Sequence, residues 1–281
     1  MTEDLIINAC INGMIPVKSS NPHTPVTPEE IVAEVERVHG LGASIVHIHA
    51  RAGDETPTWE PAYYQEIVSG IRERTPGIVV CVTTSGRLWN EPEKRAAALL
   101  LDGTAKPDMG SLTLGSLNFP KQVSSNPAST IQYLLDVMRE RNIRPELEAF
   151  DLGMIDYAGY LVATGRMASP LYMNILLGNR GTADAHAANL DFMVSRLPAD
   201  TTWAATGIGK TQFDVHRMAL HRGGHVRVGI EDNLYLDHAT KTPARNSDLI
   251  ERVLAEARTL GRAPMPSAAV RERLGLPPAG V

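Results

Sequence analysis

The chain has 281 residues, of which 43% are hydrophobic and 21% charged, with a formal net charge of −5. This composition is typical of a globular protein and argues against a disordered or fibrous chain. Because the charge is mild and the basic residues are dispersed, we expect small-molecule partners rather than nucleic acid or a membrane surface. The chain has no apolar run near ~18 residues and an acidic start, so we expect a cytoplasmic protein without a spanning helix or secretory signal.

The first half of the chain alternates short β-rich runs with helical segments. Residues 5–13 are typical of a strand, and Thr27-Pro28-Glu29-Glu30 predicts the start of a helix. Threonine is a common N-cap, proline suits the first helical position, and acidic residues favour the first turn. The same order continues with strands at 44–51, 78–85 and 109–114 and helices at 61–74, 91–101 and 127–141.

The second half repeats this alternation. Strands are expected at 145–151, 171–177, 201–206 and 226–231, and helices at 154–163, 185–196, 213–221 and 246–260. Eight strand–helix units in a chain of this length predict an α/β fold, a closed (β/α)8 TIM barrel, rather than an open sheet. We expect one catalytic domain over residues 1–262. A C-terminal extension over 263–281 should pack outside the barrel or on a neighbouring subunit.

Two histidines occur in the second predicted strand, in Val46-His47-Ile48-His49. Because strand side chains alternate, both histidines point to one face. Imidazole is a good zinc ligand, and a catalytic zinc takes three protein ligands and keeps one position open. Glu231 and Glu148 are the candidates for the third ligand, and we prefer Glu231 because Glu148 lies deeper. Glu148 would then orient a histidine or hold an inward cation, and simple ion pairs without a metal are the alternative.

Further polar residues lie where the predicted strands end, which is where barrel enzymes place their chemistry. Arg227 points inward on the last strand and needs a carboxylate from the protein or a substrate. Asp232 is the nearest acid in the sequence, and beside Arg227 it would be ionised and able to act as a general base. A structural ion pair is the alternative.

A glycine-rich turn follows the seventh predicted strand. The segment Thr206-Gly207-Ile208-Gly209-Lys210-Thr211 is not a P-loop, because Ala204 stands where the first glycine would be. Barrels nonetheless bind phosphate at this position. Gly207, Gly209 and Lys210 are therefore candidates for binding a phosphate-bearing cosubstrate, with a plain tight turn as the alternative.

Five segments, spread in order over about residues 6–261, resemble the β-keto acid cleavage enzymes. They are Thr27-Pro28-Glu29-Glu30-Ile31, Gly42-Ala43-Ser44-Ile45-Val46-His47-Ile48-His49, Ser111-Leu112-Thr113, Phe150-Asp151-Leu152-Gly153-Met154 and Gly223-Gly224-His225-Val226-Arg227-Val228-Gly229-Ile230-Glu231-Asp232-Asn233. The resemblance implies a zinc-dependent barrel, usually a homotetramer, that converts a β-keto acid and acetyl-CoA into acetoacetate and a new acyl-CoA. It implies that His47, His49 and Glu231 bind zinc and that Arg227 supports Asp232 as the base.

The resemblance also implies substrate contacts. Thr83 stands where the family usually has the serine of a Ser-Thr-Gly-Gly motif, and Ser85 replaces one of its glycines. Thr83 and Thr113 would hydrogen-bond the substrate or an oxyanion, and Gly207, Gly209 and Lys210 would face the CoA phosphates. The following polar residues complete the expected substrate and catalytic set: Asn12, Ser85 and Glu148.

The expected keto acid has an uncharged tail. Family members that accept an aminated keto acid carry an acid in the first βα loop, where this chain has Ile15 between Met14 and Pro16. An ammonium group facing Ile15 would lose its water without gaining a counter-charge. We therefore expect a preference for uncharged, aliphatic β-keto acids.

Two other functions are compatible with a zinc barrel. A hydrolase of the amidohydrolase type has its His-x-His on the first strand and histidines at the ends of strands five and six, whereas these strands end here in Phe150-Asp151 and Leu176-Leu177. A non-catalytic barrel that binds a phosphate ligand would hold a structural metal. Two histidines and one acid leave a coordination position open, which structural zinc sites avoid.

Overall fold

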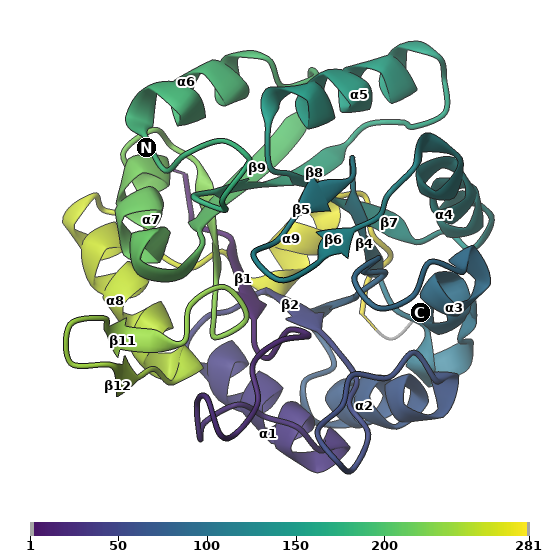
Figure 1. Ribbon diagram of the computed structural model, residues 1–281, viewed down its shortest axis with the longest axis horizontal. Helices are drawn as coiled ribbons and strands as arrows, with labels where there is room; N and C mark the ends of the chain where they lie inside the picture. The colour runs from purple at the N-terminus through teal and green to yellow at the C-terminus, as the bar shows by residue number, and fades with distance from the viewer. Residues whose placement is uncertain (1–2, 280–281) are drawn as a thin grey trace.

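The computed structural model describes residues 3–279 and contains a closed barrel of eight parallel strands with helices around it (Figure 1). The barrel closes where the last strand pairs with the first, with Asn8 opposite Arg227. The predicted TIM barrel is confirmed. Its strands, in order around the barrel, are β1 (Ile7–Cys10), β2 (Ile45–Ile48), β3 (Val79–Val82), β4 (Met109–Thr113), β7 (Arg144–Ala149), β8 (Leu171–Leu177), β9 (Thr201–Gly207) and β10 (His225–Val228).

The outer ring of helices covers the barrel on all sides in Figure 1. Thr27 caps the first helix, and a reciprocal bond from Thr27 N–H to Glu30 completes the capping box that the sequence indicates. Among residues 3–279 no helix combines the length and apolarity that a membrane crossing would need. The ring consists of α1 (Pro28–Gly40), α2 (Pro61–Arg74), α3 (Pro92–Ala96), α4 (Ala128–Glu140), α5 (Leu152–Ala163), α6 (Ala187–Ser195), α7 (Gln212–Leu220) and α8 (Asn246–Thr259).

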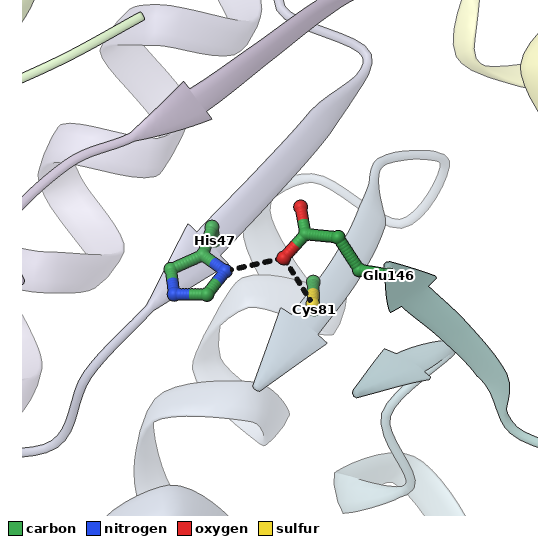
Figure 2. A group of neighbouring side chains, drawn as sticks. All are labelled: His47, Cys81 and Glu146. Atoms are coloured by element: carbon green, nitrogen blue, oxygen red, sulfur yellow. Dashed lines mark hydrogen bonds and ion pairs between the residues drawn. The ribbon is translucent and has the colours of Figure 1, made fainter. Parts of the chain in front are cut away.

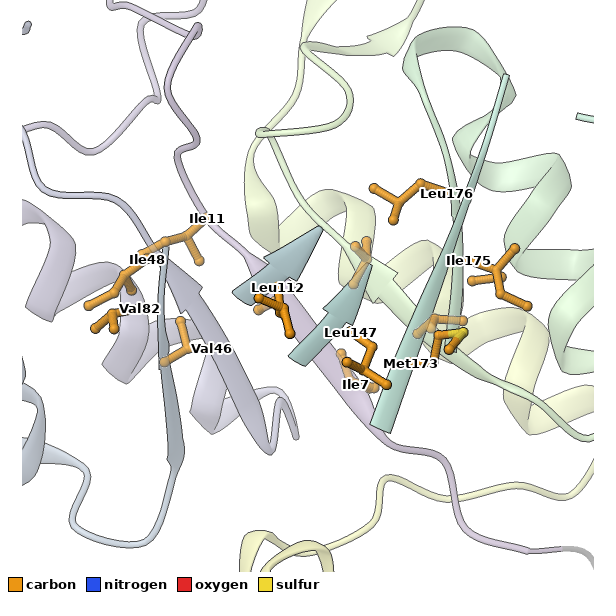
Figure 3. Close-up of a cluster of buried hydrophobic side chains, with 14 of the residues drawn as sticks. Ile7, Ile11, Val46, Ile48, Val82, Leu112, Leu147, Met173, Ile175 and Leu176 are labelled. Atoms are coloured by element: carbon orange, nitrogen blue, oxygen red, sulfur yellow. The ribbon is translucent and has the colours of Figure 1, made fainter. Parts of the chain in front are cut away.

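Alternation along the strands separates an outer core from the barrel interior. On β2, Val46 and Ile48 are buried among apolar side chains of the outer core, while His47 and His49 occupy the other face. Figure 3 shows Val46 and Ile48 together with Ile7, Ile11, Val82, Leu112, Leu147, Met173, Ile175 and Leu176. The apolar positions that bury the helices therefore also fix the inward direction of both histidines.

The C-terminal extension closes the amino-terminal end of the barrel with α9 (Ser267–Arg273), which lies behind the barrel centre in Figure 1. Arg271 in this helix pairs with both carboxylate oxygens of Asp108, at 3.0 and 2.8 Å. One buried apolar cluster joins inward residues at the strand starts to the extension: Ile6, Ile45, Val79, Cys81, Met109, Tyr172, Ala204, Met265, Val270, Leu274 and Leu276. The extension thus forms the floor of the barrel rather than packing on its outside.

Several short elements differ from the expectation. The predicted helix at 91–101 ends at Ala96 and continues as two 3-10 turns, η1 (Ala97–Leu100) and η2 (Gly103–Ala105), and a further 3-10 turn, η3 (Gly209–Thr211), follows β9. Two small hairpins were not expected, because strands of two or three residues are too short to give a periodic pattern. They are β5 (Leu117–Asn118) with β6 (Val123–Ser124), and β11 (Tyr235–Asp237) with β12 (Thr242–Pro243).

Candidate active site

A cavity of about 530 Å³ lies at the carboxyl end of the barrel. This volume is in the usual range for small-molecule sites. Loops after most of the strands contribute to its wall, as do residues of both small hairpins. The predicted site residues that line it are Ile15, His47, His49, Thr83, Ser85, Thr113, Glu148, Gly209, Arg227, Glu231 and Asp232.

His47, His49 and Glu231 converge on one point of this cavity. The two histidine Nε2 atoms are 3.1 Å apart, and Glu231 Oε1 is 3.3 Å from His49 Nε2. Glu231 Oε2 is 3.7 Å from His47 Nε2 and has no hydrogen-bond partner among the described residues. Ligand atoms around a tetrahedral zinc lie roughly 3.3–3.6 Å apart. The three side chains therefore fit a divalent metal with the chemistry and spacing of a two-histidine, one-carboxylate site.

Glu146 holds His47 in the orientation that this site needs. Figure 2 shows one Glu146 oxygen accepting from His47 Nδ1 at 2.6 Å and from Cys81 Sγ at 3.1 Å. The other oxygen accepts from Asn8 and Asn174. Because Nδ1–H donates to Glu146, the Nε2 lone pair is directed toward His49 and Glu231, as in many carboxylate–histidine–zinc arrangements. Orientation of a histidine, which the sequence assigned to Glu148 as one of two options, is thus performed by Glu146.

Cys81 takes part as a neutral thiol in this arrangement. Burial, followed by the charge of Glu146, raises the pKa of Cys81 well above its ordinary value. A buried thiol that donates to a carboxylate is a poor metal ligand, because the thiolate is the form that binds metal. We therefore interpret the close grouping of His47, Cys81 and Glu146 as support for the metal triad and not as a second metal site.

Arg227 organises the carboxylates of the site. Its Nε donates to Asp232 Oδ2 at 3.0 Å, and one terminal nitrogen donates to Glu148 Oε1 at 2.8 Å. The other terminal nitrogen lies 2.9 Å from Glu231 Oε1. Glu148 also accepts from Thr113 at 2.7 Å. One buried guanidinium thus fixes three acids, and Glu148 holds the inward cation as the sequence suggested.

The charges of the triad explain its pKa values. Burial lowers the pKa of His49 to about 4, so His49 is neutral and can offer a lone pair. Burial also disfavours the charged form of His47, but the carboxylates of Glu231 and Glu146 raise the pKa of His47 to about 9. For Glu231, burial is outweighed by Arg227 and the two histidines, which hold its pKa well below the ordinary value. A metal would bind by displacing the proton from His47.

The pKa of Asp232 departs from the sequence-based expectation. Burial raises this pKa, the neighbouring Glu231 adds to the rise, and Arg227 opposes it without reversing it. Cys10 donates its thiol to Asp232 Oδ2 at 3.3 Å. A carboxylate with a raised pKa is a stronger proton acceptor than an ordinary one. The raised pKa of Asp232 therefore favours its role as a base.

Asn12 does not join the predicted substrate contacts in the cavity. Its side-chain oxygen accepts from the His49 backbone N–H at 3.1 Å, and its nitrogen donates to the His49 carbonyl at 2.8 Å. A second, longer bond runs to the carbonyl of Pro25. Asn12 therefore fixes the backbone of His49, one of the candidate metal ligands, and is not placed to bind substrate.

The glycine-rich turn is only partly directed at the cavity. Gly209 lines it and donates its backbone N–H to the carbonyl of Asp232 at 2.7 Å. Gly207 is packed against the backbone of Thr211, where a Cβ atom would lie 2.4 Å from the carbonyl oxygen. Lys210 is exposed and faces a separate surface depression that also includes Arg252. The three predicted CoA contacts are thus not brought together.

Arg87 lines the cavity as well, and the sequence-based interpretation did not include it. Its guanidinium lies over the ring of Phe119, 3.3 Å from the ring centroid. Its position directly after the segment Thr83-Thr84-Ser85-Gly86 is the signal that could have identified it, because that segment was already expected at the mouth of the barrel.

Comparison with known proteins places this site in a family. The family model of the beta-keto acid cleavage enzyme matches residues 4–276. A 3-oxoadipate:acetyl-CoA acetyltransferase of Cupriavidus necator is 38% identical over 99% of this chain and 96% of its own. A 3-keto-5-aminohexanoate cleavage enzyme of Fusobacterium nucleatum subsp. nucleatum is 37% identical over 93% of this chain and 94% of its own.

Among solved structures, apo ObcA has the same fold with a TM-score of 0.81 at 22% sequence identity. The match covers 91% of this chain and 66% of the ObcA chain. The family model and the two relatives cover nearly the whole sequence, including every residue of the proposed metal triad. The chain belongs to the beta-keto acid cleavage enzyme family.

Proposed function

We propose that the protein is a zinc-dependent acyltransferase that converts a β-keto acid and acetyl-CoA into acetoacetate and a new acyl-CoA. The observation that carries this proposal is the convergence of His47, His49 and Glu231 beside Asp232 in one cavity. The 3-oxoadipate:acetyl-CoA acetyltransferase among the relatives supports the choice of cosubstrate. Cytoplasmic location, the homotetramer and the division into a domain of residues 1–262 and an extension of 263–281 stay predictions.

The metal would be held by His47, His49 and Glu231. When bound, a zinc ion would supply Lewis-acid polarisation of a substrate oxygen. The fourth position left by three protein ligands makes this chemistry possible. Glu146 and Asn12 keep the two histidines in place, one through a ring nitrogen and the other through the backbone.

Asp232 would move the proton. It accepts a proton from C2 of the keto acid, and C2 then forms a bond with the carbonyl carbon of the acetyl group as the CoA thiolate leaves. The thiolate attacks C3, the bond between C2 and C3 breaks, and C2 of the resulting acetoacetate recovers a proton from Asp232. Arg227 would hold Asp232 and Glu148 in fixed positions throughout, while Thr83 at the cavity wall would donate a hydrogen bond to a substrate oxygen. Thr113 donates its hydroxyl to Glu148 and would therefore keep that carboxylate in place rather than donate to the substrate.

The tail of the keto acid would not be cationic. Ile15 lines the cavity with 55% of its surface exposed and offers no counter-charge for an ammonium group. The relatives do not decide the matter, since one is named for a keto diacid and the other for an aminated keto acid at nearly equal identity. The uncharged tail expected from the sequence rested on Ile15 and its apolar neighbours Met14 and Pro16.

The test is to incubate the purified protein with acetyl-CoA and a set of β-keto acids and to follow acetoacetate and new acyl-CoA by mass spectrometry. Asp232→Asn should keep a full equivalent of metal but lose the exchange of C2 hydrogen with deuterium from solvent. Unchanged exchange in Asp232→Asn would remove Asp232 from the proposed role. Absence of both products with every keto acid would reject the function itself.

A further inference from the structure

Arg87 is a charged residue of the cavity that neither the metal triad nor the proton transfer uses. Its guanidinium stacks on Phe119, whose ring in turn meets Phe150 edge-on at 5.8 Å between centroids. Within residues 3–279 the guanidinium makes no ion pair or hydrogen bond, and only its backbone N–H donates, to Ser85. Arg87 is therefore a cation inside a binding cavity without an acidic partner.

Arg227, the fully buried guanidinium of the cavity, differs in this respect. Arg227 pairs with three carboxylates, which are the three acids that line the cavity: Glu148, Glu231 and Asp232. These acids are thus already engaged, and none forms an ion pair with Arg87. A partly buried cation without a counter-ion is less stable than one that is paired with an anion. An anionic group that enters the cavity would therefore bind favourably to Arg87.

The stacked position suits a carboxylate ligand. When one face of a guanidinium lies on an aromatic ring, its N–H groups point outward in the plane and remain free to donate. Two parallel N–H groups match the two oxygens of a carboxylate. Stacking on Phe119 also restricts the side chain before ligand arrives, which reduces the entropy lost on binding.

We propose that Arg87 binds a second carboxylate at the far end of the keto acid, so that the preferred substrates are β-keto diacids. This inference rests on the proposed function and names its substrate class. The second carboxylate takes no part in the bond changes and leaves within the new acyl-CoA. Ile15 offers no counter-charge to a substrate with a cationic tail. Arg87 favours a substrate with an anionic tail over the uncharged tail expected from the sequence.

The experiment compares kcat/KM for 3-oxoadipate and for 3-oxohexanoate, which has the same number of carbons but no second carboxylate, at saturating acetyl-CoA. The wild type should prefer the diacid. Arg87→Met should lower kcat/KM for the diacid about 10- to 100-fold, the usual effect of removing a charge-assisted hydrogen-bond pair, and leave the neutral acid within about threefold. Arg87→Lys should retain part of the preference, because a point charge remains without the paired donors.

Lys94→Met is the matched control, because it removes one positive charge from the same βα unit at a side chain that lies over Trp59 and not in the cavity. It should keep the wild-type preference. Arg87→Gln, which preserves polarity, replaces Arg87→Met if the latter does not fold.

Three results would overturn the inference: a wild type that prefers the neutral acid, an equal loss for both acids in Arg87→Met, or, in a second series with acetyl-CoA varied at fixed diacid, an effect of Arg87→Met confined to the KM for acetyl-CoA. An equal loss for both acids would mean that Arg87 binds the carboxylate next to the reacting carbon. An effect confined to acetyl-CoA would mean that Arg87 binds CoA. No turnover of any β-keto acid would reject the proposed function, and this inference with it.

Discussion

At the scale of single residues, the site depends on one buried cation surrounded by acids. Each nitrogen of the Arg227 guanidinium is paired with a different carboxylate, and two of these carboxylates are the proposed metal ligand Glu231 and the proposed base Asp232. Replacement of one partner in such a cluster leaves an uncompensated buried charge. The cluster therefore fixes Glu231 and Asp232 at a defined separation before any ligand enters.

The first prediction concerns the partner of His47. Glu146→Gln removes the negative charge that fixes the Nδ1–H tautomer, so we expect metal affinity to fall about 10- to 100-fold, the usual effect of losing such an outer partner. Affinity is measured by competition with a chelator of known zinc affinity. Glu148→Gln serves as the control, because Glu148 contacts Arg227 and Thr113 but neither histidine. Equal affinities in the two variants would show that Glu146 does not orient the metal site.

The sequence predicted the parts of the site that depend on strand alternation and failed where contacts cross the barrel. A period of two residues is enough to place His47 and His49 on one face. Whether Glu146 or Glu148 reaches His47 depends on the stagger of strands β2 and β7, which lie apart in the barrel order and leave no trace in either local pattern. Asn12 and His49 follow neighbouring strands, and their contact was missed because a local pattern does not show whether an inward amide binds backbone or substrate.

At the scale of elements, close approach between β1 and β10 closes the barrel next to the site. A Cβ atom on Gly229 would lie 2.0 Å from the carbonyl oxygen of Cys10, and Gly229 directly precedes the segment that carries Glu231. Strand ends with such contacts cannot be recognised from propensity, whereas the capping box of α1 can, because it depends only on residues three positions apart. Helix starts were therefore predicted better than strand ends.

The second prediction compares two glycines. Gly229→Ala should lower the free energy of unfolding by about 3 kcal/mol, because the new methyl group displaces backbone and not a flexible side chain. Gly159→Ala, in the middle of α5 with nothing within 4 Å of the new Cβ atom, should raise it by about 0.5–1 kcal/mol. Urea denaturation monitored by circular dichroism measures both. Similar unfolding free energies in the two variants would mean that β1 and β10 can move apart to accommodate the methyl group without loss of stability.

At the scale of the whole molecule, the barrel has an apolar floor and a polar mouth. Within the single strand β2, the inward side chain is apolar at Ile45 and polar two residues later at His47. The helix α9 covers the apolar end of the barrel. Arg271 anchors this helix through Asp108, which also binds Arg72 of α2 at 2.7 Å. Eight strand–helix units could be counted from the sequence, but the role of the extension could not, because its few apolar residues match the barrel floor only in three dimensions.

The outer layer also joins the barrel through buried histidines, and this makes the stability of the whole protein depend on pH. His216 on α7 donates through Nε2 to the carbonyl of Arg227 at 2.7 Å. Burial lowers the pKa of His216 to about 4, and the positive charge of Arg252 adds to this effect. His225, with Nδ1 facing the backbone N–H of Ile6 and the guanidinium of Arg262, has its pKa lowered to about 3, mainly by burial.

The third prediction follows from the sign of this shift. In the unfolded chain a histidine binds a proton near pH 6.5, whereas folded His216 remains neutral down to about pH 4, so the unfolded state takes up more protons between these values. Stability is therefore fully present above pH 6.5 and is lost as the pH falls toward 4. For His216 alone the loss between pH 7 and pH 5 is about 2 kcal/mol.

In His216→Gln, the fall in unfolding free energy between pH 7 and pH 5 should be smaller than in the wild type by about 2 kcal/mol. Urea titrations of both proteins at both pH values measure the difference, and an unchanged fall in His216→Gln would show that His216 is not kept neutral by the fold.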